Sequence, residues 1–301
     1  MNSLPACRPS RVTLILLAAV TAIVATLALV ISQPGAAHAT TARPAVGARH
    51  ASAIAKAAAT TSGPKPTIVL VHGAWADGGS WAPVAERLQQ LGYTVDIPPN
   101  TLRGVPEDSA YLKDFLTTIS GPIVLVGHSY GGFLISNAAT GNSQVKALVF
   151  VDAYLPAQGE TLEQLNNAKP GSCVASTSVL TTAPYPGATN GDYDTYIKQS
   201  WFPGCFANGL PAAEGAELAA EQRPTAASTF TEPSGVPAWK TIPSWDVIGT
   251  ADRVLVPAEQ LVMAERAHAH ITEIKGAPHL SMLSNPGTVT SVILKAVHAT
   301  S

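Results

Sequence analysis

Residues 123–132 read IVLVGHSYGG. An uninterrupted apolar run is typical of a strand that is buried on both faces, and the G-x-S-x-G pattern from Gly127 to Gly131 is typical of a sharp turn from a strand into a helix. On such a turn Ser129 has a strained backbone that projects its hydroxyl from the end of the sheet, and the flanking glycines avoid collisions. The alternative is an ordinary glycine-containing turn. The neighbouring motifs favour a nucleophile at Ser129.

The chain on both sides of this motif alternates between short apolar runs and amphipathic segments. Continuous apolar strands that alternate with helices predict an α/β fold with a mostly parallel sheet covered on both faces. The strands are expected at 67–71, 93–97, 123–126, 145–151, 245–248 and 270–274, and the helices at 80–91, 107–119, after the nucleophile turn through Ala139, at 257–267 and from Asn285-Pro286 onward. Helical periodicity places Leu91 on the apolar face of the first helix and Tyr111 on the inward face of the second.

The alternation stops between residues 153 and 236, where clear strand signals are missing and Pro, Gly and aromatic residues are frequent. Open α/β folds bind ligands beyond the carboxyl ends of their strands, so we interpret this segment as a cap inserted over that edge. The alternative is a long disordered insertion. The aromatic side chains require burial and favour the cap.

A serine hydroxyl needs a base and a group that orients the base. Asp252 follows the strand expected at 245–248, and His279 follows the one expected at 270–274. The order Ser129, Asp252, His279 is the order of an α/β-hydrolase triad. Asp152 directly follows the strand at 145–151 and is a competing acid, but we favour Asp252.

Attack by Ser129 places negative charge on a carbonyl oxygen, which requires two N–H donors already in position. One is expected from the backbone of Tyr130, directly after the nucleophile. The other is expected from Ala74, in the loop after the first strand, where Gly73 permits close approach. We expect His72 to support this loop.

Four motifs together resemble the α/β-hydrolase superfamily, in particular the branch of plant methylesterases, hydroxynitrile lyases and their bacterial esterase relatives. The motifs are HGAW (72–75), GHSYGG (127–132), GTADRVLVP (249–257) and GAPHLSMLSNP (276–286). The resemblance covers about residues 67–298 and implies triad roles for Ser129, Asp252 and His279 and an oxyanion hole at Ala74 and Tyr130. Hydroxynitrile lyases of this branch carry lysine directly after the catalytic histidine, whereas this chain has Leu280. Cyanohydrin cleavage is therefore disfavoured.

These features predict a serine esterase that cleaves small-molecule carboxylic esters through an acyl-enzyme, without a metal or an organic cofactor. Amide or lactone hydrolysis and cofactor-free perhydrolysis use the same triad and remain alternatives. A non-catalytic ligand-binding protein on a hydrolase scaffold is a third alternative.

Charge is distributed unevenly along the chain. Residues 1–66 contain six Lys or Arg and no acid, so the remainder carries 12 basic and 20 acidic side chains, a net charge of −8 with His neutral. This charge argues against nucleic acid as a partner.

The N-terminus has the order of a secretory signal. Arg8 and Arg11 precede an uncharged, mostly apolar run from 12 to 31, and the small-residue sequence Ala37-His38-Ala39 follows. We predict a signal peptide at 1–39, a flexible lead at 40–66 and a hydrolase domain at 67–301, in a secreted protein. The alternative is an uncleaved membrane anchor, because the apolar run is long enough to span a bilayer.

Cysteine usage agrees with export. Cys7 would be removed with the signal peptide, which leaves Cys173 and Cys205 as the cysteines of the mature chain. We expect a disulfide between them. The alternative is a pair of free buried thiols.

Cleavage after Ala39 is testable on protein recovered from the culture medium. Mass spectrometry is expected to find Thr40 as the first residue, because the small side chains at 37 and 39 match the signal-peptidase pattern. Recovery of intact Met1 in the membrane fraction would refute cleavage and favour the anchor.

Overall fold

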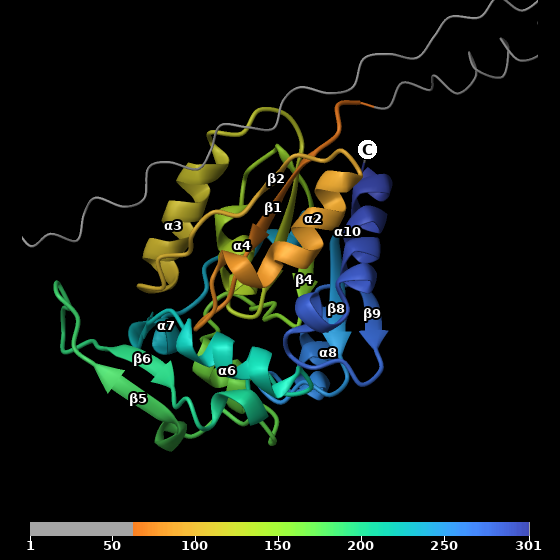
Figure 1. The fold of residues 1–301 in the computed structure, drawn as a ribbon. Coiled ribbons are helices and arrows are strands. Elements are labelled where there is room, and N and C mark those ends of the chain that lie inside the picture. Colours follow the sequence, from red (N-terminus) through yellow and green to blue (C-terminus); the bar gives the residue numbers. More distant parts are fainter. Residues whose placement is uncertain (1–62, 301) are drawn as a thin grey trace, which may run out of the picture. The chain divides into compact units, whose positions relative to one another are not determined.

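A parallel sheet forms the centre of the computed structural model, which describes residues 63–300 (Figure 1). Its six strands lie in the order β2-β1-β3-β4-β8-β9, and every neighbouring pair is parallel. The strands are β1 (Thr67–Val71), β2 (Val95–Asp96), β3 (Ile123–His128), β4 (Val145–Val151), β8 (Ser244–Gly249) and β9 (His270–Ile274).

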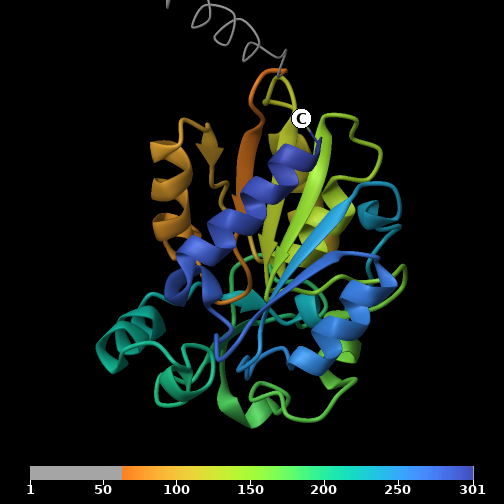
Figure 2. The ribbon, with the colours of Figure 1, turned by 90° about the vertical axis from the view of Figure 1, so that its right-hand side faces the viewer.

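Helices cover both faces of this sheet (Figures 1 and 2). Helix α2 (Ala82–Gln90) packs beside α10 (Pro286–Thr300) on one face, and α3 (Val105–Leu116) packs beside α4 (Gly131–Ala138) on the other. Helix α8 (Pro257–Arg266) packs against β8. The predicted α/β-hydrolase fold with a parallel central sheet is therefore confirmed.

Two expected helix positions are wrong in detail. The helix expected at 80–91 is a 3₁₀ turn, η1 (Gly78–Trp81), followed by α2, and it ends before Leu91, whose side chain is 51% exposed. Tyr111 in α3 was expected to face inward and is 40% exposed. Leu91 follows the end of its helix, and the Tyr111 side chain combines an apolar ring with a polar hydroxyl. Neither residue requires full burial, so helical periodicity alone misplaced both.

The segment between β4 and β8 forms the cap, which lies beyond the carboxyl ends of the parallel strands (Figure 1). Although its sequence has no clear strand signals, three short strands form an antiparallel sheet in the order β5-β6-β7. These strands have two to four residues, too few to give an alternating pattern. The cap elements are α5 (Leu162–Asn167), η2 (Thr177–Val179), β5 (Leu180–Ala183), β6 (Asp194–Ile197), η3 (Phe202–Gly204), α6 (Ala212–Ala220), β7 (Thr225–Ala226) and α7 (Ser228–Thr231); η4 (Ala238–Lys240) precedes β8, and α9 (Ser281–Ser284) precedes α10.

A disulfide joins Cys173 to Cys205 inside the cap, with their Cα atoms 5.7 Å apart, as is usual for a bridge. The alternative of two free thiols is thereby excluded. The cap aromatics are divided: Phe202 and Phe206 are buried, whereas Tyr193 and Trp201 are 42% and 47% exposed. The expected burial of the cap aromatics is therefore confirmed for Phe202 and Phe206 and wrong for Tyr193 and Trp201.

None of the helices within residues 63–300 is long and apolar enough to cross a membrane. The predicted signal peptide, residues 1–39, and most of the predicted lead, residues 40–66, lie outside the described residues.

Strand β8 carries an unusual residue for a sheet interior. Asp246 is fully buried, and neither of its carboxyl oxygens has a hydrogen-bond partner within residues 63–300. Burial, and secondarily the charge of nearby Asp152, raises the pKa of Asp246 well above its usual value. Folding therefore extends the neutral form of this carboxyl to higher pH than in the unfolded chain.

This carboxyl predicts a pH dependence of stability. Because the folded-state pKa is raised, the contribution of Asp246 is fully present below the unfolded-state pKa of about 4 and is lost as pH rises, by up to about 1.4 kcal/mol per pH unit until the folded-state pKa is reached. The Asp246→Asn variant has no carboxyl at this position and therefore lacks this loss. Measured by urea denaturation, the free energy of unfolding of the variant minus that of wild type should increase as the pH rises from 4 to 8. Parallel curves for the two proteins would contradict the assignment.

Candidate active site

Ser129 lies on the turn between β3 and α4, at the carboxyl end of the sheet. Its φ is 51°, a left-handed conformation that is unusual for a residue other than glycine, and its side chain borders a cavity under the cap. The turn is held by its neighbours, since the Ser129 N–H donates to the Val151 carbonyl and the Gly132 N–H donates to the Ser129 carbonyl. The strained turn expected from G-x-S-x-G is present.

Close packing explains the first glycine of this pattern. A Cβ atom on Gly127 would lie 2.6 Å from the Gly131 carbonyl oxygen, and one on Gly73 would lie 2.7 Å from the Ser129 Cβ. Any side chain at either position would displace backbone. The loop after β1 therefore packs directly on the nucleophile turn, as the sequence predicted.

His279 and Asp252 come from loops that follow β9 and β8, and the structure brings them together. The distance between His279 Nδ1 and Asp252 Oδ2 is 2.8 Å, and both side chains are fully buried. Asp252 Oδ2 also accepts a hydrogen bond from Gln260 Nε2 at 2.8 Å, while Oδ1 accepts from the backbone N–H of Val254 and Leu255. Four donors thus converge on one carboxylate.

The protonation of this pair follows from its surroundings. Burial lowers the pKa of His279 from 6.5 to about 3, so the imidazole is neutral at neutral pH. Burial raises the pKa of Asp252, and the hydrogen bonds from Val254, Leu255 and Gln260 oppose that rise. With Nδ1 donating to Asp252, the Nε2 atom of His279 carries the free lone pair.

That Nε2 atom has no hydrogen-bond partner within residues 63–300, so no hydrogen bond joins it to Ser129. Hydrogen bonds between catalytic groups are often long without substrate and shorten in the complex. His128, next to the nucleophile, lies against His279: the ring centroids are 4.7 Å apart, and His128 Nε2 donates to the His279 carbonyl at 3.0 Å. The nucleophile turn and the histidine loop are therefore in direct contact.

Asp152, the competing acid, has a different place. Its Oδ1 accepts from the backbone N–H of Gly249 at 2.7 Å, and its Oδ2 accepts from the backbone N–H of Ser281 at 3.2 Å. These two amides flank the loops that carry Asp252 and His279. Asp152 is not hydrogen-bonded to the imidazole and instead ties the two loops to the end of β4.

The expected oxyanion-hole residues both border the cavity beside Ser129. Neither the backbone N–H of Ala74 nor that of Tyr130 donates a hydrogen bond to another group in the part of the chain that the structure describes. Two free donors next to a candidate nucleophile are what a developing oxyanion requires.

His72 supports this loop, as expected. Its Nε2 accepts from the backbone N–H of Asn100 at 3.0 Å, so its Nδ1 carries the proton and donates to the Gly73 carbonyl at 3.0 Å. Burial lowers the pKa of His72 to about 4, so it stays neutral. On the other side of the loop, the Trp75 indole donates to the Thr195 carbonyl and so connects the loop to the cap sheet.

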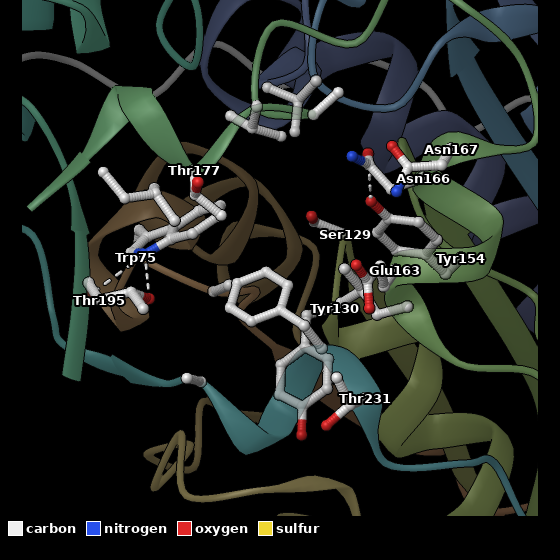
Figure 3. Close-up of a pocket in the computed structure, with 18 of the residues that line it drawn as sticks. Trp75, Ser129, Tyr130, Tyr154, Glu163, Asn166, Asn167, Thr177, Thr195 and Thr231 are labelled. Atoms are coloured by element: carbon white, nitrogen blue, oxygen red, sulfur yellow. Dashed lines mark hydrogen bonds between the residues drawn. The ribbon is translucent and has the colours of Figure 1, made fainter. Parts of the chain in front are cut away.

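The cavity has a volume of about 190 Å³ and lies between the end of the main sheet and the cap. Figure 3 shows Ser129 between Trp75 on one side and Tyr154 and Glu163 on the other. Among residues 63–300, no group of three or more His, Cys, Asp and Glu side chains is placed to hold a metal ion.

Sequence reasoning missed the roles that three residues play in holding the site together. Gln260 lies one helical turn into α8 and reaches back to Asp252, His128 reaches the His279 loop, and Asp152 ties the two later loops together. For His128 the available signal was a polar residue at the end of an otherwise apolar strand, whereas the mixed sequence of α8 gave no signal for Gln260. For Asp152, the signal was its position at a strand end.

Comparisons with known proteins identify the family of the chain. The model of a family described as "Alpha/beta hydrolase family" matches residues 68–292. A carbendazim-hydrolysing esterase of Nocardioides sp. (strain SG-4G) is 33% identical over 112 residues, which are 32% of this chain and 46% of that protein. The match thus spans about half the length of that relative.

Two further relatives match over most of their length. The alpha/beta hydrolase nvfD of Aspergillus novofumigatus (strain IBT 16806) is 28% identical over 258 residues, covering 77% of this chain and 96% of that protein. The crystal structure of polyneuridine aldehyde esterase superposes with a TM-score of 0.64 at 21% identity, covering 77% of this chain and 98% of that chain. At this identity the likeness concerns the fold.

The protonation of His279 can be measured directly. Because burial lowers its pKa, the ¹⁵N shifts of its imidazole should remain those of the neutral Nδ1–H form from pH 8 down to pH 5, whereas the urea-unfolded protein should titrate near about 6.5. Protein labelled with ¹⁵N-histidine serves for both titrations. A folded-state midpoint at or above 6.5 would contradict the assignment.

Proposed function

The chain belongs to the alpha/beta hydrolase family, and from this premise we propose that it is a secreted serine esterase that cleaves small-molecule carboxylic esters through an acyl-enzyme. Its relatives include proteins named as esterases and hydrolases, which supports hydrolase activity. The observation that carries the proposal is the buried hydrogen bond of 2.8 Å between His279 and Asp252 at the same sheet edge as Ser129.

In the first half of the reaction, Ser129 Oγ attacks the carbonyl carbon of the ester while Nε2 of His279 takes the hydroxyl proton. Asp252, whose ionised form is favoured by the hydrogen bonds from Val254, Leu255 and Gln260, holds the Nδ1–H tautomer and stabilises the imidazolium that forms. The carbonyl oxygen becomes negatively charged and accepts from the backbone N–H of Ala74 and Tyr130. Collapse of the tetrahedral intermediate breaks the bond to the alcohol, which leaves with the proton from His279.

In the second half, His279 takes a proton from water, and the resulting hydroxide oxygen attacks the acyl carbon attached to Ser129. A second tetrahedral intermediate collapses, the acid leaves, and His279 returns the proton to Ser129 Oγ. The neutral starting state of His279, which its burial favours, serves both halves because each begins with proton abstraction.

The cap supplies the substrate cavity in this proposal. Aromatic and aliphatic side chains form much of its wall, including Trp75, Leu180 and Phe230. A small or medium ester with an apolar acyl or aryl group fits such a wall. The proposed domain division is the cap at about 153–236 within a hydrolase domain at 67–301.

The disulfide fits an exported enzyme, because such bonds persist in oxidising compartments. It also has a local role. The Cys173 N–H donates to the Arg253 carbonyl at 2.7 Å, and Asn208, three residues after Cys205, donates to the Ala251 carbonyl at 3.0 Å. The two linked cap segments thus hold both sides of Asp252.

Substitution of the nucleophile tests the mechanism. Ser129→Ala removes the attacking oxygen, and we expect hydrolysis of p-nitrophenyl acetate to fall at least about 10³-fold because the acyl-enzyme cannot form. Circular dichroism and the melting temperature should match wild type, since the hydroxyl makes no hydrogen bond within residues 63–300 that folding would lose. Turnover retained in a folded Ser129→Ala protein would reject the proposal.

A fluorophosphonate probe separates an enzyme from a binding protein on the same scaffold. Wild type should gain one adduct on Ser129 by mass spectrometry, and Ser129→Ala should gain none. A wild-type protein without the adduct would favour ligand binding instead.

A further inference from the structure

The cavity beside Ser129 has an unusual charge balance. Among its lining residues no Lys, Arg or His occurs, and Glu163 is the single side chain that is charged at neutral pH. The folded part of the chain has the same sign, since residues 67–301 carry 12 basic and 20 acidic side chains. A positively charged group is the only kind of ion that this wall would attract.

Glu163 is an exposed residue on the wall of this cavity. Its carboxylate makes no ion pair and no hydrogen bond with other residues in the described range 63–300. Acidic residues are common in the first turn of a helix, but the first turn of α5 is already capped: Thr161 accepts from the Gln164 N–H, and the Gln164 side chain accepts from the Thr161 N–H. The Glu163 carboxylate is therefore free to contact a ligand.

Aromatic rings supply a second kind of contact for a cation. Five aromatic residues line the same cavity: Trp75, Tyr130, Tyr154, Tyr193 and Phe230. The faces of such rings attract ammonium groups, and the attraction grows when the site excludes water. Figure 3 shows Tyr154 beside Glu163, across the cavity from Trp75.

Hydrogen bonds fix the hydroxyl groups of two of these aromatic residues. The Tyr130 hydroxyl donates to Asp108 Oδ2 at 2.8 Å, and the Tyr154 hydroxyl donates to Asn166 Oδ1 at 3.0 Å. Burial, followed by the charge of Asp108, raises the pKa of Tyr130 well above its usual value, so the ring stays a neutral phenol. Both hydroxyl groups are thus occupied, so these two residues offer a ligand their rings and not a free hydroxyl donor.

We propose that this cavity takes esters that carry a positively charged nitrogen, with Glu163 as the counter-ion and the surrounding aromatic rings as the second contact. The inference rests on the proposed esterase function and names its substrate class. The substrate therefore combines an ester carbonyl at Ser129 with an ammonium group toward α5.

Two pairs of substrates with matched shapes test the preference. The first pair is butyrylcholine and 3,3-dimethylbutyl butyrate, with the charge in the alcohol. The second pair is the p-nitrophenyl ester of 4-(trimethylammonio)butanoic acid and that of 5,5-dimethylhexanoic acid, with the charge in the acyl group. Wild type should prefer the cation in at least one pair by about tenfold in kcat/KM, and added salt should reduce the preference. No preference in either pair would overturn the proposal.

Variants locate the effect. Glu163→Gln keeps the shape and removes the charge, so the preference, which is the ratio of the two kcat/KM values within a pair, should fall to about twofold or less. Glu217→Gln is the matched control, because Glu217 lies in α6, is exposed and does not line the cavity. An equal loss of preference in both variants would show general charge attraction and would overturn a specific site at Glu163.

Binding separates this inference from the esterase proposal. Butyrylcholine binding to Ser129→Ala is measured by calorimetry, with Ser129→Ala/Glu163→Gln as the comparison. If wild type hydrolyses none of the esters but binding weakens about tenfold in the double variant, the cation site stands and the esterase proposal fails. If esters are hydrolysed and binding is the same in both variants, the cation site fails and the esterase proposal stands.

Discussion

The hydrogen bond between Asp252 and His279 is the interaction on which the rest of the site depends. Both side chains are fully buried, so the pair exists only if the surrounding structure compensates for lost hydration. Gln260 and two backbone amides satisfy the carboxylate, and Asp152 holds the two loops at the end of the sheet. Burial keeps the imidazole neutral, and its hydrogen bond to Asp252 through Nδ1 leaves Nε2 available.

Parallel strands explain how distant residues reach this pair. The carboxyl ends of β3, β8 and β9 lie at one edge of a single sheet, so the residues that follow them emerge close together although they are about 150 residues apart in sequence. The contact between His128 and His279 shows how closely the first and last of these loops approach. The cap then closes the edge, and the disulfide fastens the cap segments that flank Asp252.

Much of the main domain could be predicted, because its signals are local. β1, β4 and β9 have the expected bounds, since each is an apolar or β-branched run ended by a turn. The strands of the cap were missed because β5, β6 and β7 are too short for a periodic pattern and are stabilised by pairing with each other. Leu91 and Tyr111 were misplaced because helical periodicity predicts which way a side chain points. It does not predict whether the neighbouring element extends far enough to cover that side chain.

The sequence by itself determined the fold class, the strained turn at Ser129 and the order in which Asp252 and His279 follow it, because turn chemistry and hydrophobic period depend on neighbouring residues. Only the tertiary structure decided between Asp252 and Asp152, joined Cys173 to Cys205 and made Glu163 the single charge on the cavity wall. These are distances between segments far apart along the chain. They are set by how the loops pack at the sheet edge, which no local pattern encodes.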